Sequence, residues 1–164
     1  MASDAMLIVP GDLTDPRIIT VLEYHVTTAL AQSPRESCHA FDVSALQRPE
    51  VSFWAAWDGE ELLGVGALMD LGRGHGEVKS MHTAKPARGR GVGSAMVRHI
   101  IATARQRGYR RLSLETGSME YFAAARALYA RHGFVECGPF EGYVPDPNSV
   151  FMTLDLAEER AAST

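Results

Sequence analysis

The sequence predicts an α/β fold, with one mixed, mostly antiparallel sheet of about seven strands flanked by helices. Three observations predict it. Short apolar segments of strand length recur along the chain, three longer segments carry apolar residues at helical spacing, and their order is β α β β β α β α β β. The 164 residues, 46% of them hydrophobic, suit one domain over 1–164. We expect an ordered core over 5–157 and a frayed tail over 158–164.

The first part of the chain predicts a strand followed by a helix. Residues 6–9 are a short apolar strand. A helix then begins at Asp15-Pro16, because Asp is a favourable N-cap and Pro is preferred at the first helical position. Its apolar residues keep helical spacing until Ser33-Pro34. Residues 34–49 predict a loop with one helical turn over 43–46.

A hairpin and one more strand come next. The apolar, aromatic-rich runs 51–57 and 61–68 are separated by Asp58-Gly59-Glu60, which is typical of a hairpin turn. A Gly-rich turn over 72–76 then leads to an alternating strand over 77–83.

The second half of the chain alternates helices and strands. Apolar residues at four-residue spacing predict an amphipathic helix over 91–107, which Gly108 ends. The following segments predict a strand, a second strong helix and two last strands, over residues 111–116, 121–132, 134–138 and 150–156.

Composition and charge exclude several classes of function. Sixteen basic and twenty acidic residues give a net charge of −4, so no global positive field favours nucleic acid or an anionic membrane. Cys38 and Cys137 lie far apart, which argues against a disulfide framework and a metal site. The sequence shows neither a basic leader nor a run of about 18 apolar residues. We expect a soluble, cytoplasmic protein with no nucleic-acid, membrane or metal partner.

Residues 85–94, Lys-Pro-Ala-Arg-Gly-Arg-Gly-Val-Gly-Ser, join a predicted strand to a predicted helix. Glycines let a ligand approach closely, and the helix N-terminus with Arg88 and Arg90 favours a phosphate. The chain lacks the Gly-Lys-Ser/Thr of ATP- and GTP-binding loops, and glycines at 89, 91 and 93 do not match the dinucleotide spacing. By itself the segment is equally compatible with a plain helix start.

Two motifs together resemble a known family. Arg88-x-x-Gly91-x-Gly93, between a strand and a helix, resembles the pyrophosphate-binding loop of the GNAT superfamily of N-acetyltransferases. One strand further on, residues 124–134, Ala-Ala-Arg-Ala-Leu-Tyr-Ala-Arg-His-Gly-Phe, resemble the A-x-x-L-Y-x-x-x-G-F segment of the same superfamily. The resemblance covers residues 6–156 and implies the GNAT fold, in which strands four and five splay apart.

The resemblance implies acetyl-CoA as co-substrate and no metal. Backbone of strand four would bind the pantetheine arm, and the glycine-rich loop would bind the pyrophosphate. This assigns cofactor binding to Met81, His82, Thr83, Arg88, Gly89, Arg90, Gly91, Val92, Gly93 and Ser94. Many members have Asn seven residues before the Tyr of the second motif, where this chain has Phe122. Contacts from that Asn are therefore not carried over.

The same resemblance implies the catalytic groups. Tyr129 matches the residue that protonates the departing CoA thiolate in many members, a task suited to a phenol because it is uncharged at neutral pH. An ammonium acceptor needs a base, for which Glu77 is the leading candidate and Glu115 or ordered water the alternatives. Tyr129 can instead belong to a helix core, and Glu77 can form a structural ion pair with Lys79. Strand alternation places His82, as a packed histidine, on the face opposite Glu77.

The acceptor is expected to reach the site from the side opposite acetyl-CoA. Lys79, Glu115 and Tyr143 are assigned to substrate binding. Two loops are expected to form the recognition surface, one with Arg35, Ser37, His39 and Asp42, the other over 143–149. The second loop can equally be a rigid polar turn.

These inferences predict an N-acetyltransferase that moves acetyl from acetyl-CoA to a small-molecule amine by direct attack. A catalytically silent acyl-CoA-binding or sensing module, and an enzyme for protein or peptide amines, remain open, as does a homodimer. Glu77-Val-Lys-Ser-Met, Leu114-Glu-Thr-Gly-Ser and Pro147-Asn-Ser-Val-Phe-Met resemble a bacterial subgroup labelled indole-3-acetate (IAA) acetyltransferase. Indole-3-acetate, however, has no amine to accept the acetyl group.

Overall fold

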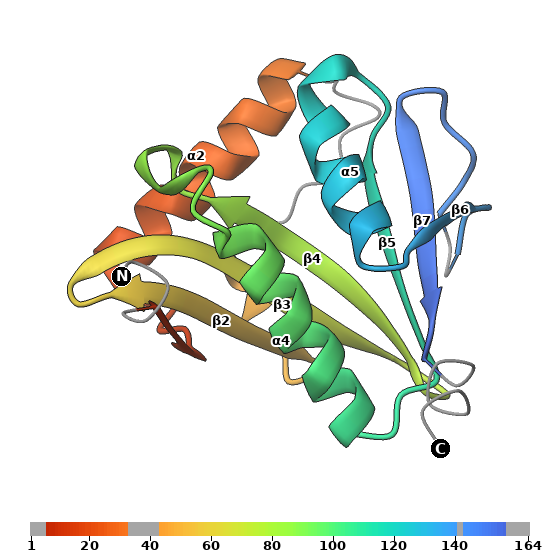
Figure 1. Ribbon diagram of the computed structural model, residues 1–164, viewed down its shortest axis with the longest axis horizontal. Helices are drawn as coiled ribbons and strands as arrows, with labels where there is room; N and C mark the ends of the chain where they lie inside the picture. The colour runs from red at the N-terminus through yellow and green to blue at the C-terminus, as the bar shows by residue number, and fades with distance from the viewer. Residues whose placement is uncertain (1–5, 33–42, 141–142, 157–164) are drawn as a thin grey trace.

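Seven strands form one mixed sheet in the computed structural model, which describes residues 6–32, 43–140 and 143–156 (Figure 1). Their spatial order is β1-β2-β3-β4-β5-β7-β6. Neighbours are antiparallel except for the parallel pair β4 and β5. The strands are β1 Met6–Pro10, β2 Val51–Asp58, β3 Glu61–Gly72, β4 His75–Thr83, β5 Arg111–Gly117, β6 Val135–Cys137 and β7 Ser149–Asp155. The predicted fold class is confirmed.

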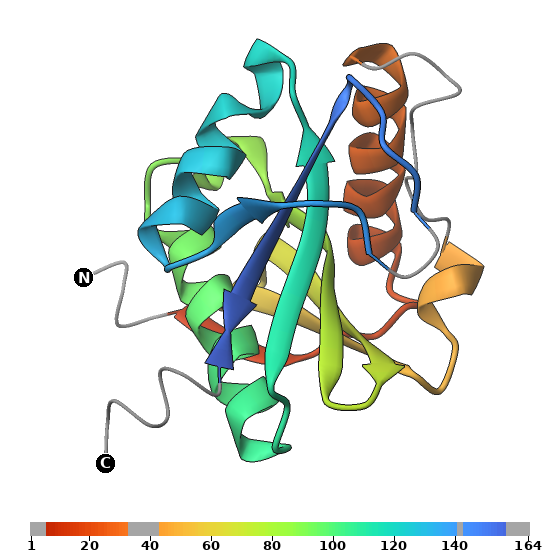
Figure 2. The ribbon, with the colours of Figure 1, turned by 90° about the vertical axis from the view of Figure 1, so that its right-hand side faces the viewer.

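Helices cover both faces of the sheet (Figure 2). One face carries α2 (Pro16–Gln32) and the short α3 (Val43–Leu46), and the other carries α4 (Val92–Gln106) and α5 (Ala123–Arg131). Short 3₁₀ turns, η2 (Lys85–Ala87) and η3 (Glu120–Phe122), precede α4 and α5. The element order predicted from the sequence is therefore confirmed, with ends that differ by a few residues.

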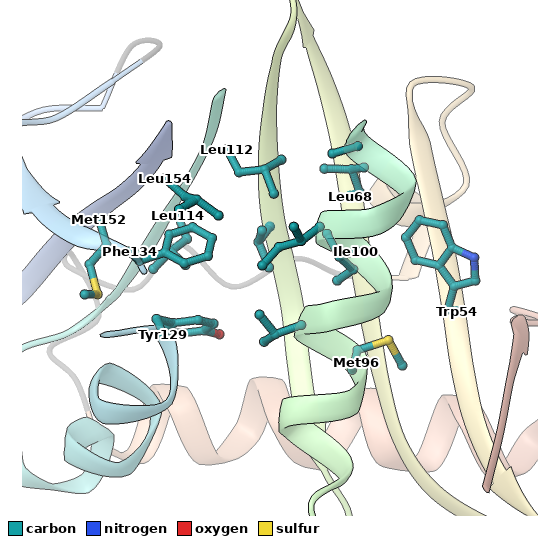
Figure 3. Close-up of a cluster of buried hydrophobic side chains, with 14 of the residues drawn as sticks. Trp54, Leu68, Met96, Ile100, Leu112, Leu114, Tyr129, Phe134, Met152 and Leu154 are labelled. Atoms are coloured by element: carbon teal, nitrogen blue, oxygen red, sulfur yellow. The ribbon is translucent and has the colours of Figure 1, made fainter. Parts of the chain in front are cut away.

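Two clusters of buried apolar side chains hold these layers together. The larger lies between the sheet and the α4–α5 layer (Figure 3), and the smaller joins Ile18 and Leu22 of α2 to β2 and β3. Met96, Ile100 and Ala104 of α4 are at most 1% exposed. The four-residue spacing therefore marks the buried face of α4, where each large apolar side chain contributes about 1.5 to 3 kcal/mol.

The helix ends follow the predicted signals. The Asp15 carboxylate accepts a 2.9 Å hydrogen bond from the backbone N–H of Arg17, which caps α2. Gly108, just after α4, has a φ of 80°, a conformation that glycine adopts without steric cost.

The parallel pairing of β4 with β5 is short. It is confined to His75 with Arg111, Gly76 with Leu112, and Glu77 with Ser113. Beyond Glu77 the two strands diverge, as Figure 1 shows. In the described sheet, the later part of the β4 edge is thus open on its β5 side, where backbone N–H and C=O groups can bond to an extended ligand.

A bulge at Ser80 interrupts the alternation of β4. Lys79 pairs with Ala67 of β3 and His82 pairs with Val65, so the three-residue step on β4 lies opposite a two-residue step on β3. Ser80 takes a φ of 55°, which is uncommon for a residue other than glycine. Because residues two apart on β3 share a face, Lys79 and His82 share one too.

The bulge corrects one prediction about His82. Alternation placed its side chain on the face opposite that of Glu77, and this is wrong. The extra residue at the bulge shifts the alternation by one, so that His82 and Glu77 lie on the same face of the sheet. His82 instead faces α2, where its ring lies edge-on to Tyr24 and His25. His82 is half-buried against these two rings, as expected of a packed histidine, and its role stays a prediction.

The turn between β3 and β4 is shorter than predicted. Gly72, Arg73 and Gly74 turn the chain with φ values of 88°, 59° and 75°. Gly76 lies within β4, opposite Asp70. Two glycines make this turn possible, and the third permits close packing inside the sheet, since a Cβ there would meet the Tyr109 ring at 2.7 Å.

Candidate active site

A cavity of about 570 Å³ lies among the open end of β4, the start of α4, and η3 with α5. Its walls include ten residues predicted for cofactor binding or catalysis: Met81, His82, Thr83, Arg88, Gly89, Gly91, Val92, Gly93, Ser94 and Tyr129. Both sequence motifs thus meet at one cavity. Arg90, Glu77, Lys79, Glu115 and Tyr143 were also predicted and are not among the residues that line it.

The glycine-rich loop brings bare backbone to this cavity. Gly89 and Gly91 have φ values of 83° and 81°, and Gly91 is the N-cap of α4. A Cβ at Gly91 would meet nothing within 4 Å, so the space beside it is open. The first N–H groups of a helix lack intrahelical partners, and the helix dipole favours an anion there. This end of the cavity is therefore suited to a phosphate group.

The two arginines of the loop have different surroundings. Arg88 lines the cavity. Arg90 instead contacts the β2–β3 hairpin, with guanidinium nitrogens 3.3 Å from the Asp58 carboxylate and 3.7 Å from that of Glu61. Arg131, at the end of α5, also lines the cavity and adds a second positive charge that the sequence did not indicate.

Ser94, in the first turn of α4, is held by two side chains. Its hydroxyl lies 2.7 Å from Nε2 of His132 and accepts a 3.1 Å hydrogen bond from Arg98. Burial, Arg98 and Arg131 together lower the pKa of His132. This contact ties the start of α4 to the end of α5, the two elements that carry the motifs.

Tyr129 belongs both to the core and to the cavity. It is 7% exposed, and its ring packs edge-on against Phe134 with centroids 5.8 Å apart (Figure 3). It still lines the cavity. Burial raises the pKa of its phenol well above the usual value. The hydroxyl therefore keeps its proton at neutral pH, as a proton donor in this cavity must.

Several lining residues were missed by the sequence interpretation. They are His25, Tyr121, Phe122, Ala124, Ala125, Leu128 and Arg131. The Phe122 ring lies against Gly117 at the end of β5, where a Cβ would lie 2.2 Å from it. The alanines of the second motif could have indicated that this face of α5 lines a cavity, because small side chains leave space for a ligand beside the helix. His25 had no such signal, since it lies 57 residues before the strand residue that it contacts.

His25 and His82 form a contact at this cavity. Their Nδ1 atoms are 3.2 Å apart and their ring planes are inclined by 73°. Burial lowers the pKa of His25, and burial, His25 and Arg88 lower that of His82 to about 4. Both rings are therefore neutral at pH 7.

Glu77, Lys79 and Tyr143 form a separate, nearly closed cluster. The Glu77 carboxylate lies 2.8 Å from Nζ of Lys79 and accepts a 2.8 Å hydrogen bond from the Tyr143 hydroxyl. The side chains of Glu77 and Lys79 are 5% and 9% exposed. Burial, with the nearby Glu77, raises the pKa of Tyr143. The ion pair with Lys79 that the sequence left open as an alternative is therefore present, and the role of Glu77 stays a prediction.

The structure describes only some of the other residues that were predicted for acceptor binding. Glu115 accepts a 2.7 Å hydrogen bond from the Ser149 hydroxyl of β7. Phe140, Tyr143 and Phe151 pack as an aromatic group, with ring centroids 5.1 to 6.0 Å apart. Arg35, Ser37, His39 and Asp42 fall in 33–42, outside the described residues, as do Cys38 and the predicted tail over 158–164.

Within residues 6–32, 43–140 and 143–156, no three or more His, Cys, Asp and Glu side chains lie close enough to hold a metal ion. None of the helices in that part of the chain is long and apolar enough to span a bilayer.

Comparison with known proteins identifies the family of this chain. The model of the acetyltransferase (GNAT) family matches residues 19–134. The uncharacterized N-acetyltransferase YedL of Escherichia coli (strain K12) is 49% identical over 147 residues, covering 90% of this chain and 92% of YedL. An IAA acetyltransferase of Azospirillum brasilense is 41% identical over 124 residues, covering 75% and 80%. The chain therefore belongs to the GNAT family of acetyltransferases.

Solved structures show the same fold. A Klebsiella pneumoniae protein, described as a possible acyl-CoA N-acyltransferase, superposes with a TM-score of 0.71 at 31% identity, covering 92% of this chain and 97% of that one. A Bacillus subtilis acetyltransferase in complex with CoA gives a TM-score of 0.67 at 21% identity, covering 92% and 99%.

Proposed function

We propose that this enzyme transfers the acetyl group of acetyl-CoA to the amine of a small molecule, by direct attack of the amine. One observation carries the proposal: the glycine-rich start of α4 and the phenol of Tyr129 line the same cavity. An anion-binding backbone and a neutral proton donor are what a CoA thioester needs at its two ends, one for its phosphates and the other for its leaving sulfur.

In this proposal the chain binds the co-substrate along one path. Backbone N–H groups at Gly91 to Gly93, with Arg88, bind the pyrophosphate, and Arg131 adds positive charge nearby. The open edge of β4 at Met81, His82 and Thr83 bonds to the pantetheine amides. The CoA complex of the Bacillus subtilis acetyltransferase supports this choice by analogy of fold.

The chemistry assigned to Tyr129 is proton donation. Attack of a neutral amine on the thioester carbonyl expels a thiolate, which a nearby phenol can protonate. Because burial raises the pKa of Tyr129, the phenol holds its proton until the sulfur becomes more basic. The direct route needs no acyl-enzyme. Cys137, the cysteine within the described residues, is exposed on β6, and burial raises the pKa of its thiol.

The acceptor side of this proposal concerns the base and the amine. Glu77 as base stays a prediction, and its two short hydrogen bonds favour a structural role, because they hold the carboxylate between Lys79 and Tyr143. Lys79, Glu115 and Tyr143 as acceptor-binding residues also stay predictions. The name of the Azospirillum brasilense relative points to indole-3-acetate as acceptor. Indole-3-acetate has no amine that could attack the thioester. We therefore propose an amine as the acceptor of this enzyme.

An acceptor screen tests this proposal. The protein is incubated with acetyl-CoA and a library of primary amines and short peptides, and released CoA thiol is followed while products are identified by mass spectrometry. We expect N-acetylated small amines, formed in step with CoA release. Acetyl-CoA binding without release for any amine would instead support the silent binding module, and release only with peptides would support a peptide acceptor.

A further inference from the structure

The His25–His82 contact gives the cavity a basic group that the sequence did not indicate. The two rings come from α2 and β4, and both line the cavity that Tyr129 lines. Their facing atoms are the two Nδ1 nitrogens, 3.2 Å apart. The Tyr24 ring packs edge-on against His82, with centroids 5.6 Å apart, and supports the pair from the α2 side.

The chemistry of imidazole fixes what such a pair can do. A hydrogen bond between two Nδ1 atoms holds one proton, so one ring is the Nδ1–H tautomer and the other accepts through Nδ1. The Nε2 atom of the donor ring then carries a free lone pair. The accepting ring has its own proton on Nε2. The pair therefore presents one basic nitrogen.

The surroundings of the two rings decide which one is basic. Arg88 follows His82 by six residues, on the loop that leaves β4, and its charge opposes a proton on His82, whereas His25 lies on the other element, α2. Tyr24 on α2 contacts the pair, and the other titratable groups that line the same cavity are Arg88, Tyr121, Tyr129 and Arg131. A proton is thus better tolerated on His25, whose Nδ1–H can donate to the neutral His82.

We propose that His25 removes the proton from the acceptor ammonium, and that His82 positions it by accepting the hydrogen bond from its Nδ1–H. The N–H bond of the ammonium breaks and its proton moves to Nε2 of His25. The freed amine forms the C–N bond as the C–S bond breaks, and the Tyr129 proton goes to the sulfur. The second proton of the attacking nitrogen then passes to the Tyr129 oxygen, which restores the phenol, and His25 releases its proton to solvent. His25 is then the catalytic base and His82 a positioning residue. This inference rests on the proposed function.

Two amines of similar shape and different basicity test the role of His25. Ethylamine is protonated at neutral pH, whereas trifluoroethylamine is largely a free amine and needs no base. With ethylamine, His25→Gln should lower kcat/KM at pH 7 by on the order of 10²-fold and remove the acidic limb of the pH profile. With trifluoroethylamine the loss should be small. An equal loss with both amines, or an unchanged acidic limb, would overturn the proposal.

Matched variants separate positioning from packing. His82→Asn keeps an acceptor near the place of Nδ1 and should retain most of the rate, while His82→Leu should resemble His25→Gln. His99→Gln is the control, because His99 packs against Trp54 and does not line the cavity. It should leave both amines unaffected. A His82→Leu enzyme as fast as His82→Asn would contradict the positioning role.

The hydrogen bond between His25 and His82 can be tested without any acceptor, by measuring the tautomers of the two rings. Nitrogen-15 NMR of the imidazoles at neutral pH should show the Nδ1–H tautomer for His25 and the Nε2–H tautomer for His82. The reverse assignment, or Nε2–H tautomers for both rings, would overturn the pair. Absence of transfer to every amine tested, with these tautomers present, would contradict the proposed function instead.

Discussion

The hydroxyl of Tyr143 donates a 2.8 Å hydrogen bond to the carboxylate of Glu77, which joins the segment between β6 and β7 to the middle of β4. The same hydroxyl accepts a 3.1 Å hydrogen bond from Lys79, whose ammonium also lies 5.8 Å from the centre of the Tyr143 ring. These three side chains thus satisfy one another in a nearly buried setting, which favours a structural role over a catalytic one.

Variants of the Glu77–Lys79 pair distinguish these roles. Lys79→Met should lower the unfolding free energy by about 3 kcal/mol, because it leaves a carboxylate buried without its cation. Glu77→Gln should also be destabilised, with a wild-type dependence of kcat/KM on pH. Denaturant unfolding and a pH–rate profile check both points. A Glu77→Gln enzyme of normal stability, with a lowered rate and an altered acidic limb, would return Glu77 to the role of base.

Gly91 should be essential for co-substrate binding. Gly91→Glu places a side chain and a negative charge in the open space at the start of α4, so acetyl-CoA binding measured by calorimetry should be lost. Gly108→Glu is the matched control, because Gly108 has a φ of 80°, close to the 81° of Gly91, and open space around it. Both variants share the backbone strain. An equal loss of affinity in both would contradict the phosphate-loop assignment.

Tyr129 should contribute to the rate through its hydroxyl. Tyr129→Phe keeps the ring that packs on Phe134, so the melting temperature should change little. The value of kcat should fall on the order of 10²-fold if proton delivery to the thiolate limits turnover. CoA release with the best acceptor measures this. Unchanged kcat would mean that Tyr129 serves only the core.

Stability should fall in mild acid because of the buried histidines. Burial lowers the pKa of His82 to about 4, below the value near 6.5 expected for the unfolded chain. The unfolded state then binds more protons than the folded state between these values, so this contribution is complete above pH 6.5 and is lost as the pH falls towards 4. Unfolding midpoints measured against pH should show a weaker dependence for His82→Asn. The same pH dependence of the unfolding midpoint in wild type and His82→Asn would argue against His82 as the source of the lost stability.

The sequence was sufficient for the order of the elements. Apolar spacing in α4 predicted its buried face, and Asp58-Gly59-Glu60 predicted the hairpin, because both signals act over a few neighbouring residues. The family resemblance likewise identified ten of the residues that line the cavity, since they lie on a few short segments. Such local patterns can be recognised in a single sequence.

Other features depend on contacts that no local pattern encodes. Nothing about Ser80 indicates a positive φ, so the bulge and the resulting direction of His82 could not be foreseen. Arg90 looked like a phosphate ligand, yet it contacts acidic residues at the β2–β3 hairpin. His25 reaches the cavity only because α2 packs across β4. Each of these required the tertiary arrangement.

Direct transfer to an amine is the central claim, and single-turnover transfer of a labelled acetyl group tests it most directly. Wild-type enzyme is mixed with isotope-labelled acetyl-CoA and its best small amine, and protein and products are analysed by mass spectrometry over time. The label should pass to the nitrogen of the amine in step with CoA release, with none bound covalently to the protein at any time. Label on the protein before it reaches the amine, or no transfer from bound acetyl-CoA, would contradict this account.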